Sequence, residues 1–502
     1  MCDTCHAVTC HKLIFVMMSG KTRPVEWRVK QLQNLLRMME ENETLICEAL
    51  HKDLRKPRQE SMALEIGYIK NDIRGIINNV HKWVADNYVE KNIVTLLDET
   101  FIHYDPLGVV LIMGAWNYPI MLSLGPLGGA IAAGNCAIVK PSEIAAASSN
   151  IIATLLPRYL DRDCFHVVEG GVAETVELLG EKFDHIFFTG STGVGRKVRE
   201  AANRHLTPVT LELGGKCPVW VDSSADLDMV ARRLLWAKCI NLGQTCIAPD
   251  YVMCSDQVQA ELLDKMRAIL LEWYGKTPQA SENLCRIINE RNFTRLRQML
   301  EASQGSVAIG GESDQADLYI APTVVTGVSS SEPLMMEEIF GPILPIMTVT
   351  SPAEAVKFIT ARPKPLSLYV FSKDKKVQKL FQSETSSGSM VMNDAVVHLS
   401  VETLPFGGVG DSGMGSYHGR YTFLTFSHEK SVLVRDFSKF GEYLGETRYP
   451  PYEDWKIKRL DFLVKNRKMP SFLGLIPYIT TFLLGAGSVF LYKYITSLPL
   501  FM

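Results

Sequence analysis

The stretch "FFTGSTGVGRKV", residues 187 to 198, passes from an apolar segment into a polar, helix-forming one through a turn of small residues. Such a turn lets backbone N–H groups face a phosphate at the N-terminus of a helix. The sequence differs from the dinucleotide-binding pattern G-x-G-x-x-G, because Thr192 stands where the second glycine would be. An ordinary strand-to-helix turn is therefore the alternative. The turn consists of Gly190, Ser191, Thr192, Gly193, Val194 and Gly195.

Other short apolar runs alternate with helix-like stretches on both sides of this turn. Runs that are apolar on both faces and separated by helices predict parallel sheets. We therefore expect two interleaved α/β domains. The runs lie at 107–114, 135–140, 164–170, 183–190 and 208–215, and then near 250–254, 319–325, 367–372 and 388–394.

The composition excludes some classes of protein. A chain of 502 residues is long enough for two or three domains. Its net charge of −3 offers no electrostatic case for nucleic acid as a partner. The 11 cysteines have no regular spacing, which indicates reduced thiols in a protein that faces the cytosol.

The first residues hold Cys2-x-x-Cys5-His6, a pattern that attaches c-type haem or supplies metal ligands. The pattern stands at the chain terminus, where order is usually low, and no helices that could enclose a haem accompany it. We expect no metal site here. Residues 1–17 are interpreted as an N-terminal extension from an upstream start.

An uncharged apolar segment runs from Ser471 to Tyr492 near the other end. A helix of that length reaches roughly 33 Å, which is enough to cross a bilayer. The basic segment 456–468 precedes it, so the positive-inside rule puts the preceding chain in the cytosol. We expect a single-pass tail anchor in the endoplasmic reticulum membrane, with the peroxisomal and mitochondrial outer membranes as other locations. A buried core helix is the alternative structure.

One cysteine lies in a turn suited to chemistry, within "NLGQTCIAPD" at 241–250. Gly243 permits a close bend, and Pro249 ends any helix soon after Cys246. A cysteine there can present its sulfur to a cleft while its own N–H binds an anion. The alternative is a small buried hydrophobic residue.

Several strand ends carry polar side chains with chemical uses. Glu212 in "LELGGKCP" is a candidate general base, or a solvated acid at a strand end. Asn117 in "GAWNYP" is a candidate oxyanion donor, or a turn residue that caps its own backbone. Lys140 and Glu143 in "KPSE" could hold ribose hydroxyls, or form an ordinary solvated pair.

Taken in order, these motifs and two further ones carry a resemblance to a known family. From about residue 20 to 435 the chain resembles the aldehyde dehydrogenase superfamily, in particular its class 3 branch. An apolar tail within that branch is similar to the membrane-bound fatty aldehyde dehydrogenases. The motifs are "WNYP", "VKPSE", "FTGSTGVG", "LELGGK", "GQTCIAPD", "EEIFGPILP" and "PFGGVGDSGMG".

The resemblance implies a role for each motif. Cys246 would be the nucleophile, Glu212 the general base, and Asn117 the oxyanion donor beside the N–H of Cys246. The cofactor would be NAD, with NADP possible. Its pyrophosphate would lie at residues 190–195, and its adenosine ribose at Lys140 and Glu143. Glu338 would hold the nicotinamide ribose, with Phe340 against it.

The resemblance also implies a domain plan and an activity. A Rossmann-like NAD-binding domain would occupy 18–212, a catalytic domain 213–430, and an oligomerisation strand with the basic segment 431–470. The chain would form a homodimer and oxidise long-chain aliphatic aldehydes to fatty acids at a lipid bilayer. The alternatives are medium-chain or aromatic aldehydes with the same chemistry, or an inactive, membrane-tethered nucleotide-binding scaffold.

Overall fold

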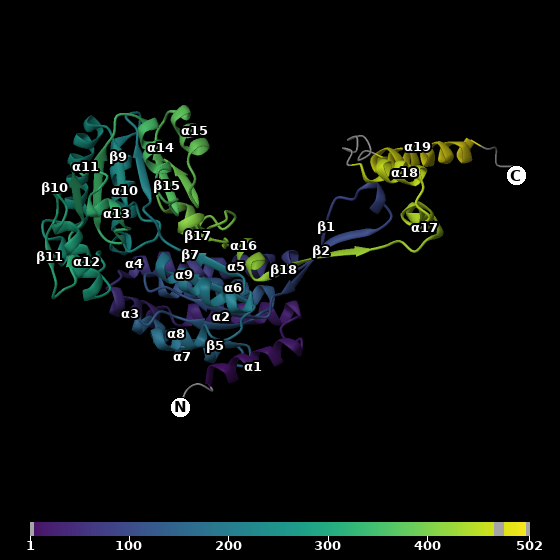
Figure 1. Ribbon diagram of the computed structural model, residues 1–502, viewed down its shortest axis with the longest axis horizontal. Helices are drawn as coiled ribbons and strands as arrows, with labels where there is room; N and C mark the ends of the chain where they lie inside the picture. Colours follow the sequence, from purple (N-terminus) through teal and green to yellow (C-terminus); the bar gives the residue numbers. More distant parts are fainter. Residues whose placement is uncertain (1–4, 466–475, 498–502) are drawn as a thin grey trace. The chain divides into compact units, whose positions relative to one another are not determined.

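The computed structural model describes residues 5–465 and 476–497 (Figure 1). The chain divides into two compact units. The first holds the described residues up to Ala85 together with His103–Lys430, and the second holds Asp86–Ile102 with the described residues from Ser431 onward. Strands β2 (Glu99–Pro106) and β18 (Ser427–Val434) run from one unit into the other.

The first unit contains a six-stranded sheet in the order β17-β7-β6-β3-β4-β5. All neighbours are parallel except β17, which pairs antiparallel with β7. The chain moves outward from β3 to β5 and returns to place β6 on the other side of β3. Ligands of such sheets bind at the carboxyl ends of the strands, where the order reverses. The strands are β3 (Val109–Met113), β4 (Cys136–Lys140), β5 (Phe165–Val167), β6 (His185–Thr189), β7 (Val209–Glu212) and β17 (Gly413–Met414).

Helices accompany this sheet, and one of them is buried on all sides. Every residue of α6 (Pro119–Ala133) is buried, which suits its almost wholly apolar sequence. The N-terminal helix α1 (Cys5–Met18) contacts β3 and β4, and its Cys10 and Leu13 are buried. The other helices are α2 (Val25–Glu41), α3 (Glu43–Leu54), α5 (Gly67–Trp83), α7 (Ala146–Tyr159), α8 (Val172–Leu178), α9 (Thr192–Ala202) and α16 (Arg420–Thr425).

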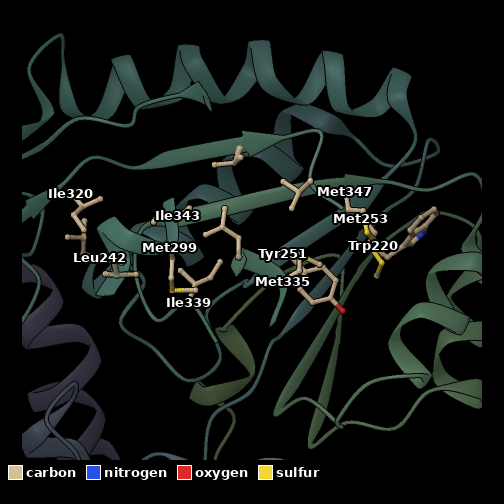
Figure 2. Close-up of a cluster of buried hydrophobic side chains, with 14 of the residues drawn as sticks. Trp220, Leu242, Tyr251, Met253, Met299, Ile320, Met335, Ile339, Ile343 and Met347 are labelled. Atoms are coloured by element: carbon tan, nitrogen blue, oxygen red, sulfur yellow. The ribbon is translucent and has the colours of Figure 1, made fainter. Parts of the chain in front are cut away.

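A second sheet of the same unit has the order β10-β13-β14-β9-β8-β15-β16, with only β10 antiparallel. Figure 2 shows the buried cluster on this sheet, where Trp220, Tyr251 and Met253 pack with side chains from later elements. The strands are β8 (Pro218–Val221), β9 (Tyr251–Cys254), β10 (Ser306–Ile309), β13 (Thr323–Thr326), β14 (Ile343–Thr348), β15 (Ser367–Phe371) and β16 (Ser389–Met392). Its helices are α10 (Leu227–Cys239), α11 (Asp256–Tyr274), α12 (Glu290–Glu301), α13 (Pro333–Met336), α14 (Pro352–Thr360) and α15 (Lys375–Glu384).

These two sheets confirm the predicted α/β fold. Strands β7 and β8 belong to different sheets and are separated only by residues 213–217. The carboxyl end of the first sheet is therefore joined directly to the start of the second. The predicted domain limits, including the N-terminal extension 1–17, stay predictions.

The second unit combines part of a three-stranded sheet with helices. Strand β1 (Asn87–Tyr88) pairs with β2, and the sheet order is β1-β2-β18. Arg435 lies 2.6 Å from the buried carboxylate of Asp98 and ties the two segments of the unit together. The helices are α17 (Lys439–Gly445), α18 (Asp454–Val464) and α19 (Ile476–Ser497).

The transmembrane helix predicted over 471–492 is not supported. Residues 471–475 lie outside the described residues, and within 5–465 and 476–497 no helix is long and apolar enough to cross a membrane. The prediction counted the absence of charge, but polar and small residues interrupt the apolar run of α19. The bilayer consequently loses its support as a partner, and the endoplasmic reticulum location stays a prediction. The interrupting residues include Pro477, Thr480, Thr481, Gly485, Gly487, Ser488 and Lys493.

Candidate active site

A cavity in the first unit brings together the three residues predicted to be catalytic: Asn117, Glu212 and Cys246. Asn117 follows β3 and Glu212 ends β7, so both stand at the carboxyl edge of the first sheet. Cys246 lies between α10 and β9, on the approach to the second sheet. The other lining residues are mostly apolar: Leu64, Tyr118, Met121, Leu122, Thr189, Ile240, Thr245, Ile247, Leu366, Val396, Leu399, Phe406 and Tyr417.

A left-handed turn presents Cys246 to this cavity. Asn241, Leu242 and Gly243 have φ values of 49°, 52° and 72°. A Cβ on Gly243 would lie 2.2 Å from the carbonyl oxygen of Gly341, so only glycine fits. The backbone N–H of Asn241 donates to the Glu60 carboxylate at 2.8 Å, which helps to hold the strained turn.

Asn117 is held in a dense hydrogen-bond network. Its side-chain amide donates to the carbonyl oxygen of Gln244 at 3.1 Å, two residues before the cysteine. Its own carbonyl oxygen accepts from Lys56 Nζ at 3.0 Å and from Asn241 Nδ2 at 2.9 Å. The amide therefore faces the cysteine segment, as an oxyanion donor would have to do.

Glu212, unlike Asn117, is not held by hydrogen bonds to its side chain within the described part of the chain. Its side chain is buried, and neither carboxylate oxygen has a hydrogen-bond partner among the described residues. Burial raises the pKa of Glu212 well above the usual value for a glutamate. A carboxyl group of this kind is suited to taking up and releasing a proton near neutral pH.

The thiol of Cys246 is also shifted by its surroundings. Removal from water raises its pKa to about 12, and the carboxylates of Glu338 and Glu212 add to the effect. In this state of the protein the thiol is therefore protonated at neutral pH. The hydroxyl groups of Tyr118 and Thr245 lie 2.9 Å apart on the neighbouring wall.

The glycine-rich turn at 190–195 follows β6 and opens α9, as its sequence predicts. A Cβ on Gly195 would lie 2.7 Å from Leu213, whereas a Cβ on Gly193 would meet nothing within 4 Å. Gly195 is thus required by packing, and Gly193 faces open space at the N-terminus of an 11-residue helix. Free N–H groups at such a position fit a pyrophosphate.

A groove beside this turn joins Thr192 to Glu338, and its floor includes Gly214 and Gly215. Glu338 approaches so closely that a Cβ on Gly214 would lie 2.1 Å from its carboxylate. Burial and the charge of Asp250 raise the pKa of Glu338 to about 8. The groove thus lies between a turn that can bind a phosphate and the Glu338 carboxylate, which can accept hydrogen bonds from ribose hydroxyls.

The remaining predicted cofactor residues occupy other places. Phe340 adopts a φ of 51° and its ring packs at 5.3 Å on Trp116. Lys140 Nζ lies 3.2 Å from the Glu143 carboxylate, with the lysine buried and the glutamate exposed. This pair ends β4 and is not part of the groove that joins Thr192 to Glu338.

Sequence reasoning missed the residues that hold the site in place. Asp250 accepts the N–H of Ile339 at 2.9 Å and forms an ion pair with Lys216. Both belong to motifs quoted above, where a charged residue after "LELGG" and another after "IAP" could have been paired. Lys56 and Glu65 lie in an N-terminal segment without a recognisable motif.

Comparisons with known proteins identify the family. Residues 18–432 match the model of the aldehyde dehydrogenase family. The chain is 49% identical over 462 residues to bovine aldehyde dehydrogenase family 3 member B1, covering 92% of this chain and 98% of the relative. It is 50% identical over 433 residues to the mouse protein named "Aldehyde dehydrogenase, dimeric NADP-preferring", covering 86% and 95%. Mouse aldehyde dehydrogenase family 3 member A2 is 46% identical over 461 residues, covering 92% and 94%.

A solved structure agrees with these sequence matches. The substrate-bound state of Staphylococcus aureus AldH superposes with a TM-score of 0.88 at 39% identity, covering 91% of this chain and 99% of that one. The chain belongs to the aldehyde dehydrogenase family. The prediction of an NAD(P)-dependent aldehyde dehydrogenase is thereby confirmed.

Proposed function

We propose that this aldehyde dehydrogenase oxidises long-chain aliphatic aldehydes to fatty acids, with Cys246 as nucleophile, Glu212 as general base and Asn117 as oxyanion donor. The observation that carries the proposal is the shared cavity: the three polar groups stand in a chamber whose other walls are almost entirely apolar. Apolar walls favour a substrate with a hydrocarbon chain, and the few polar groups fix its reacting end.

The residues suggest the following division of work. Once its thiol has lost a proton to solvent, the Cys246 sulfur attacks the aldehyde carbon, and the oxyanion that forms is held by the amide of Asn117 and the backbone N–H of Cys246. When bound, the nicotinamide cofactor accepts the hydride whose loss leaves a thioester on Cys246. Glu212 then takes a proton from water, and the resulting hydroxide releases the carboxylic acid.

A groove next to the cavity supports a long substrate. Leu64 and Ile240 line both the catalytic cavity and a neighbouring groove. Trp236, Trp273 and Tyr274 also line that groove. An extended acyl chain could therefore lie past Leu64 and Ile240 against aromatic side chains, whereas a small aldehyde would use only the inner chamber.

We infer that NAD is the better cofactor and that the chain is a homodimer. Glu143 is exposed at the expected adenosine ribose, where its charge would repel the 2′-phosphate of NADP. The name of the mouse relative, dimeric and NADP-preferring, supports the dimer but favours the other cofactor. Comparing the dissociation constants of NAD and NADP for the wild type and Glu143→Gln would decide the cofactor, and sedimentation analysis would decide the dimer.

The substrate is tested by comparing kcat/KM for hexadecanal, octanal and benzaldehyde. We expect hexadecanal to be the best of the three. Leu64→Phe, which narrows the passage, should reduce kcat/KM for hexadecanal more than for propanal. A preference for octanal or benzaldehyde of about tenfold in the wild type would favour the alternative substrates instead.

A further inference from the structure

A buried ion pair stands directly behind the oxyanion donor. Lys56 Nζ lies 2.5 Å from Glu65 Oε1, and neither side chain is exposed to solvent. The same ammonium group donates to the carbonyl oxygen of Asn117 at 3.0 Å and lies 4.2 Å from the ring centre of Tyr118. Among the described residues, its hydrogen-bond partners thus belong to the pair and to the turn that carries the proposed donor.

The second carboxylate oxygen of Glu65 holds the other end of this turn. Glu65 Oε2 accepts the backbone N–H groups of Ile120 and Met121 at 2.9 and 3.3 Å. These groups belong to the first turn of α6, whose N–H groups have no partner within the helix. The segment from Asn117 to Met121 is therefore fixed at its start by Lys56 and at its end by Glu65.

A local irregularity of the chain puts Glu65 in position. Residues Ser61–Ile66 form a π-helical turn between α4 (Arg58–Glu60) and α5. The N–H of Gly67 bonds to the carbonyl oxygen of Met62, and a Cβ on Gly67 would lie 2.6 Å from that oxygen. Such turns are frequent at functional sites because they re-aim side chains. Here Glu60 and Glu65, five residues apart, both reach active-site backbone.

Hydrogen bonds from Lys56 and from Asn241 both reach Asn117, the proposed oxyanion donor. Asn241 Nδ2 donates to the carbonyl oxygens of both Asn117 and Gln244 at 2.9 Å. The Asn117 amide in turn donates to Gln244, which precedes the cysteine segment. A shift of the Lys56–Glu65 pair would thus move the donor relative to Cys246.

We propose that Lys56 and Glu65 are positioning residues that hold the Asn117 amide where the oxyanion forms. The proposal rests on the function proposed above, in which Asn117 stabilises that oxyanion. Displacing a catalytic group by about 1 Å can cost about a hundredfold in rate. The bonds of the pair end on backbone atoms of 117–121, and we expect their effect on hydride transfer to pass mainly through Asn117.

A simpler role in folding stability makes a different prediction. A buried pair with one partner removed leaves an uncompensated charge and is strongly destabilising, so a single variant could simply unfold. The test therefore uses Lys56→Met/Glu65→Gln, which removes both charges and keeps an acceptor for the N–H groups of α6. Glu65→Gln alone is the milder second variant.

The measurement is the rate of hydride transfer in a single turnover, in the wild type and in an Asn117→Ala background. In the wild-type background the double variant should lower this rate by about 10- to 100-fold, with the dissociation constant of NAD changed less than about twofold. In the Asn117→Ala background the same change should lower it by less than about threefold, because the group being positioned is gone.

A second, partly exposed lysine–glutamate pair close by in the sequence provides the control. Lys70 Nζ lies 2.6 Å from Glu43, between α5 and α3, and neither residue lines the cavity. Lys70→Met/Glu43→Gln should leave hydride transfer unchanged in both backgrounds.

The outcomes separate the two proposals. Suppose that Asn117→Ala slows hydride transfer and that the Lys56–Glu65 change lowers the rate by the same factor in both backgrounds. The positioning role is then contradicted, while the role of Asn117 stands. If Asn117→Ala reacts like the wild type, the role of Asn117 fails and the positioning role fails with it. Loss of the Lys56–Glu65 effect specifically in the Asn117→Ala background supports both.

Discussion

The two polar walls of the active-site cavity are built in opposite ways. On one wall the amide and the carbonyl oxygen of Asn117 are both hydrogen-bonded, to Gln244 and to Lys56 and Asn241. On the other wall no described residue bonds to either oxygen of Glu212. A donor that must meet a developing charge benefits from being fixed in advance. A base that must serve the hydrolytic step benefits from a carboxylate that remains free to bind water.

Cys246 lines the same cavity, and its removal should have the largest effect. Cys246→Ser should lower steady-state turnover by about three orders of magnitude or more, because a serine hydroxyl ionises far less readily than a thiol. Binding of NAD should be retained. Cys47→Ser on α3, away from the cavity, is the control and should keep its activity. Near-normal turnover of the Cys246 variant would remove it from the mechanism.

Replacing Glu212 should slow the hydrolysis of the thioester and leave the earlier transfer of hydride intact. In Glu212→Gln we expect up to one NADH per active site in a rapid burst, followed by steady turnover reduced about a hundredfold. Rapid-mixing absorbance at the NADH band measures both phases. A missing burst with intact NAD binding would show that the carboxylate also acts before hydride transfer. Full steady activity would contradict any role of Glu212.

The rate at which Cys246 is alkylated at different pH values tests whether the pKa of its thiol is raised. Because burial raises the pKa of Cys246 to about 12, the thiolate is the minor form at every lower pH. Its alkylation by iodoacetamide in cofactor-free enzyme should therefore accelerate about tenfold for each pH unit between 7 and 9. The Cys246→Ser enzyme corrects for other cysteines. A rate that levels off below pH 8 would mean that hydrogen bonds to the thiolate outweigh burial.

The smallest expected effect comes from removing one hydrogen bond, that between the hydroxyl groups of Tyr118 and Thr245. Tyr118→Phe removes the 2.9 Å contact with Thr245 and should lower the free energy of unfolding by about 1 kcal/mol. Turnover should change less than about threefold, since neither hydroxyl has a role in the proposed chemistry. Urea unfolding followed by fluorescence measures the first quantity. The exposed Tyr452→Phe is the control, and equal stability losses in the two variants would contradict a specific contribution.

The sequence predicts the α/β fold and the three polar groups of the cavity, because each stands in a short motif next to a strand or a turn. It does not predict the Lys56–Glu65 pair. That contact depends on a π-helical turn at Ser61–Ile66 and on packing against α6, neither of which leaves a periodic pattern. The transmembrane helix predicted over 471–492 is not supported, for a different reason. The prediction judged a segment by its missing charges, whereas crossing a bilayer requires sustained apolar character.

The most direct test of the central claim is to trap the acyl group on the enzyme. Glu212→Gln protein is mixed with NAD and octanal, quenched in acid and analysed by mass spectrometry of the intact chain and of its peptides. We predict an added octanoyl mass on the peptide that contains Cys246, and no such mass when Cys246→Ser is combined with Glu212→Gln. An acyl group on another residue, or an unmodified chain after a full burst of NADH, would contradict the account.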